Sequence, residues 1–97
     1  MRQYEVMYIL KADLEDAKRQ EVVDTLHAII TNENGTVDNV DEWGLKDFAY
    51  EIDHMKKGYY VVIKVSCETD TIKEFDRLMR INPNVVRHLI VNMEEMQ

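Results

Sequence analysis

Residues 59–67 read YYVVIKVSC, and they form the segment of the chain that is most typical of a β-strand. β-Branched and aromatic residues dominate the segment, and such residues are enriched in strands. Alternation places Val61, Ile63, Val65 and Cys67 on one side of the strand and the intervening residues on the other. A strand with one uniformly apolar side predicts a sheet that packs this side against a second layer.

Two further strands are expected near the ends of the chain. In Arg2–Leu10 the residues Tyr4, Val6 and Tyr8 share one side, and the other side is also largely apolar. A strand that is apolar on both sides is expected in the middle of a sheet. The last strand is expected over Val85–Met93.

The region Thr36–Ile52 is also predicted to be extended, although its apolar residues do not alternate strictly. Gly44 interrupts the region, which predicts a bulge or a kink there. Charged residues interleaved with apolar ones are a common protection of exposed strands, so this region is expected at an edge of the sheet. Residues His54 to Gly58 are predicted to form a turn before the strand at 59–67.

Helices are expected between the first and second strands and between the third and fourth. Apolar residues at helical spacing predict the first helix over Leu14–Glu33, with Asp13 as its N-cap and Asn34-Gly35 as its end. The second helix is expected to begin at the Thr69-Asp70-Thr71 cluster, which with Glu74 resembles a capping box. Asn82-Pro83 is expected to end it, because proline disfavours helical geometry in the preceding residue. Its predicted buried stripe is Ile72, Phe75, Leu78 and Met79.

The order strand-helix-strand-strand-helix-strand predicts an α+β fold. Right-handed crossovers on both strand-helix-strand units place the first and third strands together in the middle of a four-stranded antiparallel sheet. Both helices then cover the same face of the sheet, which is the ferredoxin-like arrangement. The other face stays open, so functional residues are expected on that face, at the edges of the sheet or in the loops.

Length and composition limit the possible classes of protein. With 97 residues, the chain is expected to form a single domain over residues 1–97. A lone cysteine, no signal-peptide pattern and no apolar run of membrane-spanning length indicate a cytoplasmic protein with no membrane association. The net charge of −7 would repel a nucleic-acid backbone at long range, which favours a basic protein partner or RNA contacts through a few clustered cations.

Catalysis and metal binding are not expected. None of His27, His54 and His88 has a cysteine, serine or carboxylate at a spacing typical of a nucleophile or a metal site. Cys67 lies on the apolar side of its strand, as a core residue would. Acylphosphatases use the same fold with a cationic loop after the first strand, whereas the loop here, Lys11 to Asp16, is acidic. We therefore expect no enzyme, no cofactor and no small-molecule substrate.

Two kinds of binding remain open. Lys57 to Lys64 resembles the RNP1 signature of RNA-recognition motifs at its start, but Val61 and Lys64 replace stacking aromatics, and a strand opened by a Lys-Gly turn explains it equally well.

Cations recur at strand and helix ends and are expected to gather near one edge, although a solvated scatter is equally compatible. These cations are Arg2, Lys56, Lys57, Arg80 and Arg87. Trp43 and Leu45 in the charged edge strand suggest a protein-docking strip, and a core role for Trp43 stays open as well.

Several segments together resemble the family of bacterial small-subunit ribosomal protein six. The segments are MRQYEVMYIL at residues 1–10, WGLKDFAYEI at 43–52, GYY at 58–60, EFDRL at 74–78 and VVRH at 85–88. The resemblance runs in register along essentially the whole chain. It implies a ferredoxin-like protein that pairs with the basic small-subunit protein eighteen and binds the central domain of small-subunit ribosomal RNA.

The resemblance also implies candidate site residues. Carried onto matching positions, the RNA contacts are expected at Arg2 and Arg87, followed by Arg80 and Lys56. The partner-facing edge is expected around Asp41, Glu42, Trp43 and Lys46. The alternative is a protein-interaction or ligand-sensing domain of the same fold outside the ribosome.

Overall fold

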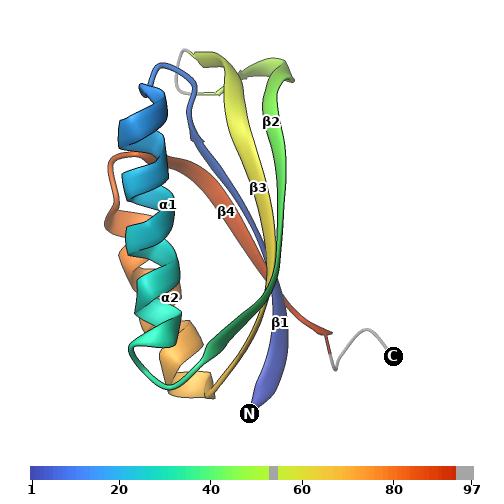
Figure 1. Cartoon of the computed structure of the whole chain (residues 1–97). Coiled ribbons are helices and arrows are strands. Elements are labelled where there is room, and N and C mark those ends of the chain that lie inside the picture. The colour runs from blue at the N-terminus through green and yellow to red at the C-terminus, as the bar shows by residue number, and fades with distance from the viewer. Residues whose placement is uncertain (53–54, 94–97) are drawn as a thin grey trace.

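Six elements follow one another in the predicted order in the computed structural model, which describes residues 1–52 and 55–93. The elements are β1 (Arg2–Lys11), α1 (Asp16–Thr31), β2 (Thr36–Ile52), β3 (Met55–Cys67), α2 (Thr69–Ile81) and β4 (Val85–Asn92). The strands form one antiparallel sheet in the order β2-β3-β1-β4. Figure 1 shows both helices on the same face of this sheet, which confirms the ferredoxin-like arrangement.

The hydrophobic core lies between the helices and the sheet. Alternation in β1 and β3 points every second side chain toward the helices, as the sequence predicted. The buried core residues are Tyr4, Val6, Tyr8, Leu10, Val22, Val23, Leu26, Ile30, Val61, Ile63, Val65, Cys67, Ile72, Phe75 and Met79. No helix in the described part of the chain is both long and apolar enough to cross a membrane.

The edge strand β2 is irregular, as its sequence indicated. Its pairing with β3 shifts register between Val37 and Asn39, between Glu42 and Gly44, and between Asp47 and Ile52. Gly44 has φ 83°, a conformation that side-chain-bearing residues rarely adopt, so the predicted interruption at this glycine is confirmed. The bulge leaves Trp43 without an opposite residue on β3.

The predicted ends of α1 are wrong in detail. The helix begins at Asp16 after the N-cap Glu15, and Asp13 does not cap it. The first helical hydrogen bond runs from the backbone N–H of Arg19 to the carbonyl oxygen of Glu15 at 2.8 Å, which makes Glu15 the N-cap. The helix therefore begins later than its sequence suggested.

The end of α1 uses Asn34 and Gly35 in a different way from the one predicted. Asn34 takes the left-handed conformation, with φ 64°, and the helix already ends at Thr31. Gly35 is needed for space instead: a Cβ there would lie 2.8 Å from Cγ2 of Ile30 and 2.9 Å from Cβ of Cys67. The glycine therefore allows the chain to pass closely over the core.

The expected cap of α2 and the expected turn before β3 are also corrected. β3 continues to Cys67, so Glu68 alone separates strand from helix, and Thr69 is already helical without a side-chain cap. In the predicted turn, Met55 to Gly58 belong to β3, and His54 lies outside the described residues. The helix ends at Ile81, just before Asn82-Pro83 as expected.

Candidate nucleic-acid and protein interfaces

The face of the sheet away from the helices presents side chains in rows that cross all four strands. Ile9 in β1 pairs with Tyr60 in β3 and with Arg87 in β4, and Tyr60 also pairs with Gly44 in β2. These residues alternate with core residues in their strands, so their side chains point to the open face. One row therefore runs from Gly44 in β2, past the aromatic Tyr60 in β3, to the cationic Arg87 in β4.

The next row continues the open face with apolar side chains. Met7 pairs with Val62 and with Leu89, and Val62 pairs with Asp41 at the β2 edge. Met7 and Val62 are half-buried, whereas Leu89 is 56% exposed. The middle of the open face is thus an apolar strip, which is a common feature of surfaces that meet another macromolecule.

At the β2 end of the face, Trp43 is held in a preformed cluster. Its ring is stacked with Tyr60, at a centroid distance of 6.3 Å and an interplanar angle of 9°. Its indole N–H donates to Oδ2 of Asp41 at 3.0 Å, and the Lys46 ammonium lies 5.7 Å from its ring centroid. Trp43 nevertheless remains 47% exposed. A large, ordered and accessible aromatic side chain is the kind of residue that anchors protein interfaces.

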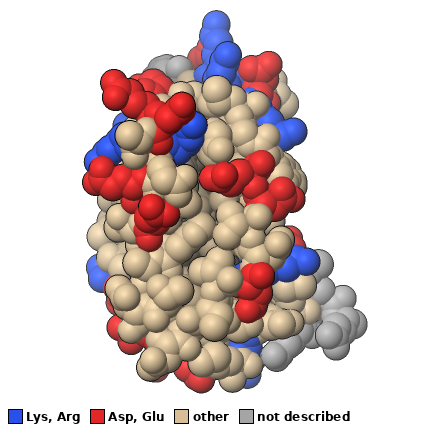
Figure 2. All heavy atoms as spheres, in the orientation of Figure 1, with Lys and Arg blue, Asp and Glu red and all other residues tan. Residues whose placement is uncertain are grey.

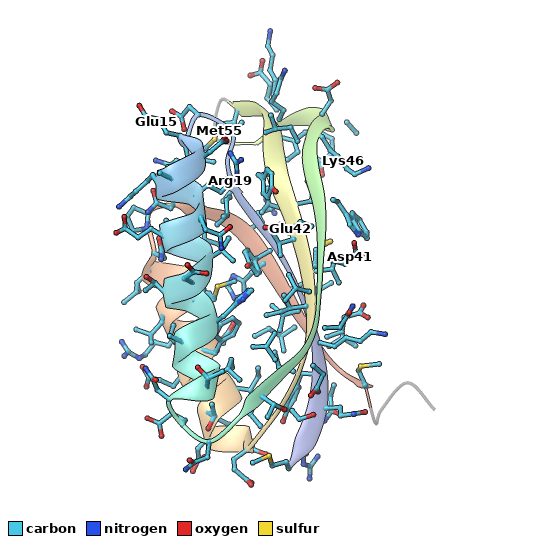
Figure 3. The ribbon with its side chains drawn as sticks, in the orientation of Figure 1. Glu15, Arg19, Asp41, Glu42, Lys46 and Met55 are labelled. Atoms are coloured by element: carbon cyan, nitrogen blue, oxygen red, sulfur yellow. The ribbon has the colours of Figure 1, made fainter. Side chains whose placement is uncertain are left out.

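The structure places three of the four candidate partner-facing residues together. Asp41, Trp43 and Lys46 lie on the open side of β2, whereas Glu42 pairs with Val61 and points toward the helices. Figure 3 shows Asp41 and Lys46 on the side of β2 away from α1, with Glu42 on the side toward it. The core role that was possible for Trp43 is wrong, because nearly half of the side chain is accessible.

Phe48 and Gly58 complete this cluster, and neither was predicted from the sequence. Phe48 packs against Tyr60 with ring centroids 6.2 Å apart. A Cβ on Gly58 would lie 2.8 Å from Cζ of Phe48 and 2.4 Å from Cγ2 of Ile9. The absence of a side chain on Gly58 therefore leaves the space that the Phe48 ring occupies, although Gly58 itself pairs with Lys46 in β2.

The RNP1-like segment is out of phase with its signature. The signature requires aromatic residues at its third and fifth positions, which here are Tyr59 and Val61. Both face the helices: Val61 is buried in the core, and Tyr59 lies under the guanidinium of Arg19. Tyr60 is the aromatic residue of this segment that reaches the open face, so the RNP1 interpretation fails because of strand register.

The candidate RNA-contacting cations do not gather at one place. Arg2 pairs with Cys67, whereas Arg87 pairs with Ile9, so the two arginines lie seven residues apart along β1, about 23 Å at about 3.3 Å per residue. Lys56 and Arg80 lie toward the same end as Arg87, in the first residues of β3 and the last turn of α2. Figure 2 shows basic side chains at that upper end of the molecule. The expected gathering is therefore wrong for Arg2, because the register places it at the other end of the sheet.

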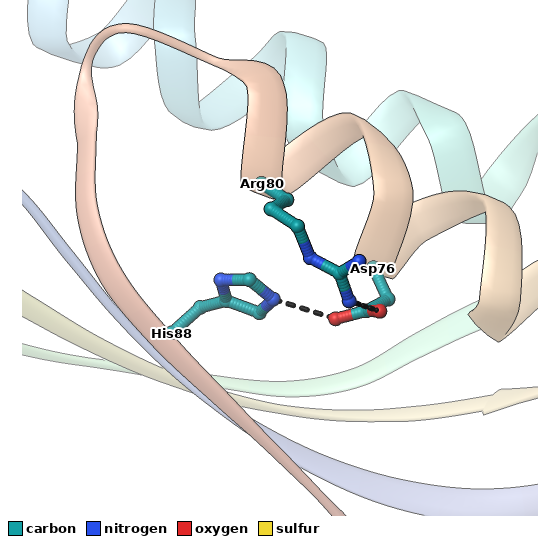
Figure 4. Close-up of polar contacts among 3 residues, drawn as sticks. All are labelled: Asp76, Arg80 and His88. Carbon is teal, nitrogen blue, oxygen red and sulfur yellow. Dashed lines mark hydrogen bonds and ion pairs between the residues drawn. The ribbon is translucent and has the colours of Figure 1, made fainter.

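A second polar cluster lies beside the β4 edge. Asp76 in α2 accepts from Arg80 one turn later, and its other carboxylate oxygen lies 2.6 Å from Nε2 of His88 in β4 (Figure 4). His88 is only 14% exposed at its side chain, whereas Arg80 is 69% exposed. From the sequence, His88 was expected to have no catalytic or metal-binding role, and Asp76 was not among the expected functional residues. The i,i+4 spacing of Asp76 and Arg80 was a signal, but the contact with His88 requires the packing of α2 on β4.

A half-buried polar pair joins β1 to α1 and has no features of a catalytic site. The hydroxyl of Tyr8 and Nε2 of His27 are joined by a hydrogen bond of 2.8 Å between β1 and α1. Burial raises the pKa of the Tyr8 hydroxyl and lowers the pKa of His27, since each charged form would be poorly solvated there. Burial also raises the pKa of the Cys67 thiol, which makes it a poor nucleophile. Within residues 1–52 and 55–93, no three His, Cys, Asp or Glu side chains are arranged to hold a metal ion.

Together these features define a class of protein: a ferredoxin-like domain whose open sheet face lies between an acidic, aromatic edge and a basic edge. Such an arrangement is suited to binding macromolecules.

Comparison with known proteins gives the family. A sequence model of the family ribosomal protein S6 matches residues 3–92, and the chain belongs to this family. It is 42% identical over 95 residues to small ribosomal subunit protein bS6 of Halalkalibacterium halodurans, covering 98% of this chain and 100% of that protein. The corresponding protein of Carboxydothermus hydrogenoformans is 41% identical over 95 residues, covering 98% and 99% of the two chains.

A solved structure supports the same assignment. The crystal structure of 30S ribosomal protein S6 from Thermotoga maritima matches with a TM-score of 0.90 and 28% sequence identity, over 98% of this chain and 90% of that chain. The expected family and fold are therefore confirmed, and the chain is a structural protein of the small ribosomal subunit.

Proposed function

We propose that the chain binds the central domain of small-subunit ribosomal RNA jointly with the basic small-subunit protein eighteen, as a ribosome-bound protein of the cytoplasm. Membership of the ribosomal protein S6 family supports a place in the small subunit. The observation that carries joint binding is the division of charge between the two edges of the sheet. β2 has five acidic residues and one basic residue, whereas β4 has Arg87 and no acidic residue.

The basic partner docks on the β2 edge in this proposal. Asp41 and Glu42 supply negative charge on the two sides of the strand, and Trp43 supplies the apolar anchor. Lys46 lies against the Trp43 ring and contributes its apolar stem to the same surface. Charge complementarity of this kind accelerates association and selects the partner. Trp43, once the partner covers it, accounts for most of the affinity.

The RNA docks around the β4 edge, because Arg87 points to the open face whereas Arg80 lies on the helical side of the sheet. Arg87, Arg80 and Lys56 contact the backbone at one end of the sheet, and Arg2 makes a separate contact at the other end. None of the four forms an ion pair with another side chain of the described residues except Arg80, which is joined to Asp76. Free guanidinium and ammonium groups are available to phosphate oxygens, which offset the repulsion from the net negative charge.

The test is binding of a central-domain RNA fragment by the protein in the presence of the purified basic partner, measured at several salt concentrations. The double variant Arg2→Ala/Arg87→Ala should bind more weakly, and the slope of log K against log salt should decrease by about 0.7 to 0.9 for each phosphate group that is no longer neutralised. The double variant Lys18→Ala/Arg77→Ala is the control, because it changes the net charge equally on the helical side. Wild-type protein that does not bind the RNA would overturn the function, and equal weakening by both double variants would overturn the site.

A further inference from the structure

The cleft between α2 and the β4 edge has the composition of an anion site. It has a volume of about 490 Å³, and Ile72 and Ile90 contribute apolar surface to it. Its polar groups are Lys73, Asp76, Arg80 and His88. Lys73, Asp76 and Arg80 lie three and four residues apart on α2, so they share the helix face that points toward β4.

Asp76, the only carboxylate among the described residues that line this cleft, is already paired on both oxygens. One oxygen accepts from Arg80 and the other lies 2.6 Å from Nε2 of His88, as Figure 4 shows. Asp76 therefore fixes the direction of the Arg80 guanidinium, while the other N–H groups of that side chain stay available. Lys73 makes no ion pair with any residue in the described part of the chain. The cleft thus presents two cations, one of them held in place by a neutralised acid.

We propose that this cleft binds a phosphate group of an RNA backbone, an inference that rests on the RNA-binding function proposed above. Arg80 and Lys73 contact the phosphate oxygens, Asp76 acts as a positioning residue for Arg80, and the apolar part of the cleft receives the sugar. Arg87 precedes His88 in β4 and points to the opposite side of the strand. A backbone that crosses the β4 edge therefore meets cations on both sides of it, which joins the cleft to the open face.

The positioning role of Asp76 predicts that removing its negative charge weakens RNA binding, which is the opposite of the usual effect. Replacing an acidic residue usually strengthens RNA binding by a protein of net charge −7, because repulsion is reduced. Asp76→Asn should instead weaken binding of the central-domain RNA fragment, by about threefold to tenfold, and Asp76→Glu should restore most of it. The matched control lies on the same helix: Glu74 pairs with exposed Arg77 outside the cleft, so Glu74→Gln and Arg77→Ala should change binding little. Lys73→Ala and Arg80→Ala in combination should lower the salt slope by about 0.7 to 0.9, because both cations contact the same phosphate group.

The outcomes separate this inference from the function on which it rests. If the wild-type protein binds the RNA but Asp76→Asn binds it as tightly as Glu74→Gln does, the cleft assignment is overturned while the function stands. Urea unfolding of each variant shows whether weaker binding reflects a loss of folding, and retained binding by Lys73→Ala and Arg80→Ala together would also overturn the cleft.

A second arm separates RNA phosphate from free phosphate. The ring resonances of His88 are followed by NMR during titration with inorganic phosphate and, separately, with the RNA fragment. Shifts that occur with the RNA and disappear in Arg80→Ala support the cleft, and similar shifts with inorganic phosphate identify it as a general anion site. Unchanged His88 resonances with both ligands would overturn the proposal.

Discussion

The two edges of the sheet differ in length, regularity and charge. β2 runs for 17 residues, shifts register three times against β3 and exposes Trp43, Leu45 and Tyr50 among five acidic residues. β4 runs for 8 residues, pairs with β1 without a shift over Arg87–Asn92 and contains no acidic residue. Bulges and charges protect an edge strand against uncontrolled pairing, so β2 has the protection that its length requires.

The net charge of −7 is distributed unevenly between the two edges. A uniform negative surface would argue against RNA, but β2 has five acidic residues and one cation, whereas α2 and β4 together have four cations and three acidic residues. The screening length at physiological salt is about 8 Å, whereas β2 and β4 lie three strand spacings of about 4.8 Å apart. Charges at the two edges are therefore largely screened from each other, and we expect each edge to bind its own ligand.

The largest expected effect concerns the support of the β2 edge. Gly58→Ala places a methyl group 2.4 Å from Cγ2 of Ile9 and 2.8 Å from Cζ of Phe48, distances that force Phe48 out of its position. We expect a loss of about 2 to 3 kcal/mol in the free energy of unfolding, measured by urea denaturation. Gly44→Ala is the matched comparison, because no atom lies within 4 Å of its Cβ and only the positive φ is unfavourable, which costs about 1 kcal/mol. Equal losses in the two variants would show that Phe48 does not depend on the gap at Gly58.

The next effect concerns the partner. Trp43→Ala removes the exposed aromatic anchor that Tyr60 and Asp41 hold in place, and we expect about a 30-fold loss of affinity for the basic partner, or about 2 kcal/mol. Isothermal titration calorimetry measures the change. Tyr50→Ala is the control, since Tyr50 lies on the same strand and is 76% exposed. Partner affinity that falls with Tyr50→Ala but not with Trp43→Ala would place the anchor elsewhere on β2.

Charge reversal tests the division between the edges directly. Asp41→Arg should slow association with the basic partner, whereas Arg87→Glu should weaken RNA binding about tenfold and leave partner association unchanged. Stopped-flow association with the partner and RNA titration at fixed salt measure the two effects. If each reversal changes both interactions to the same extent, net charge and not edge chemistry controls binding.

The fold could be predicted from the sequence because local residue patterns indicate its strands and helices. Alternation in residues 59–67 identified the buried side of β3, and Gly44 in a charged extended region identified the irregular edge. The caps were predicted less well. Asp13 and Thr69 match cap preferences, but the first backbone bond of α1, from Arg19 to Glu15, and the continuation of β3 to Cys67 mark where the helices begin.

The candidate sites could be predicted only in part, because the register between strands decides which of their residues lie close together. The separation of Arg2 from Arg87 follows from which residues of β1 pair with β3 and β4, and no local pattern states this. The contact between Asp76 and His88 likewise depends on how α2 is placed over β4. The family resemblance suggested Asp41, Trp43 and Lys46 together, and the structure places these three residues on the same side of β2.

The smallest expected effect concerns a pair that belongs to neither edge. Burial lowers the pKa of His27, and the nearby carboxylates of Asp24 and Glu42 offset this only in part. As the pH falls below about 6.5, the unfolded chain therefore takes up a proton at His27 before the folded chain does, and the free energy of unfolding decreases. His27→Gln keeps a side-chain group that can bond to the Tyr8 hydroxyl but removes the titration, so its stability should fall less than that of the wild type between pH 7 and pH 5. Urea denaturation at intermediate pH values measures both profiles, and parallel profiles would show that His27 does not contribute to acid sensitivity. Because the pair lies between β1 and α1 and belongs to neither edge strand, protonation of His27 should change the affinities of the two edges only at a pH at which the domain unfolds.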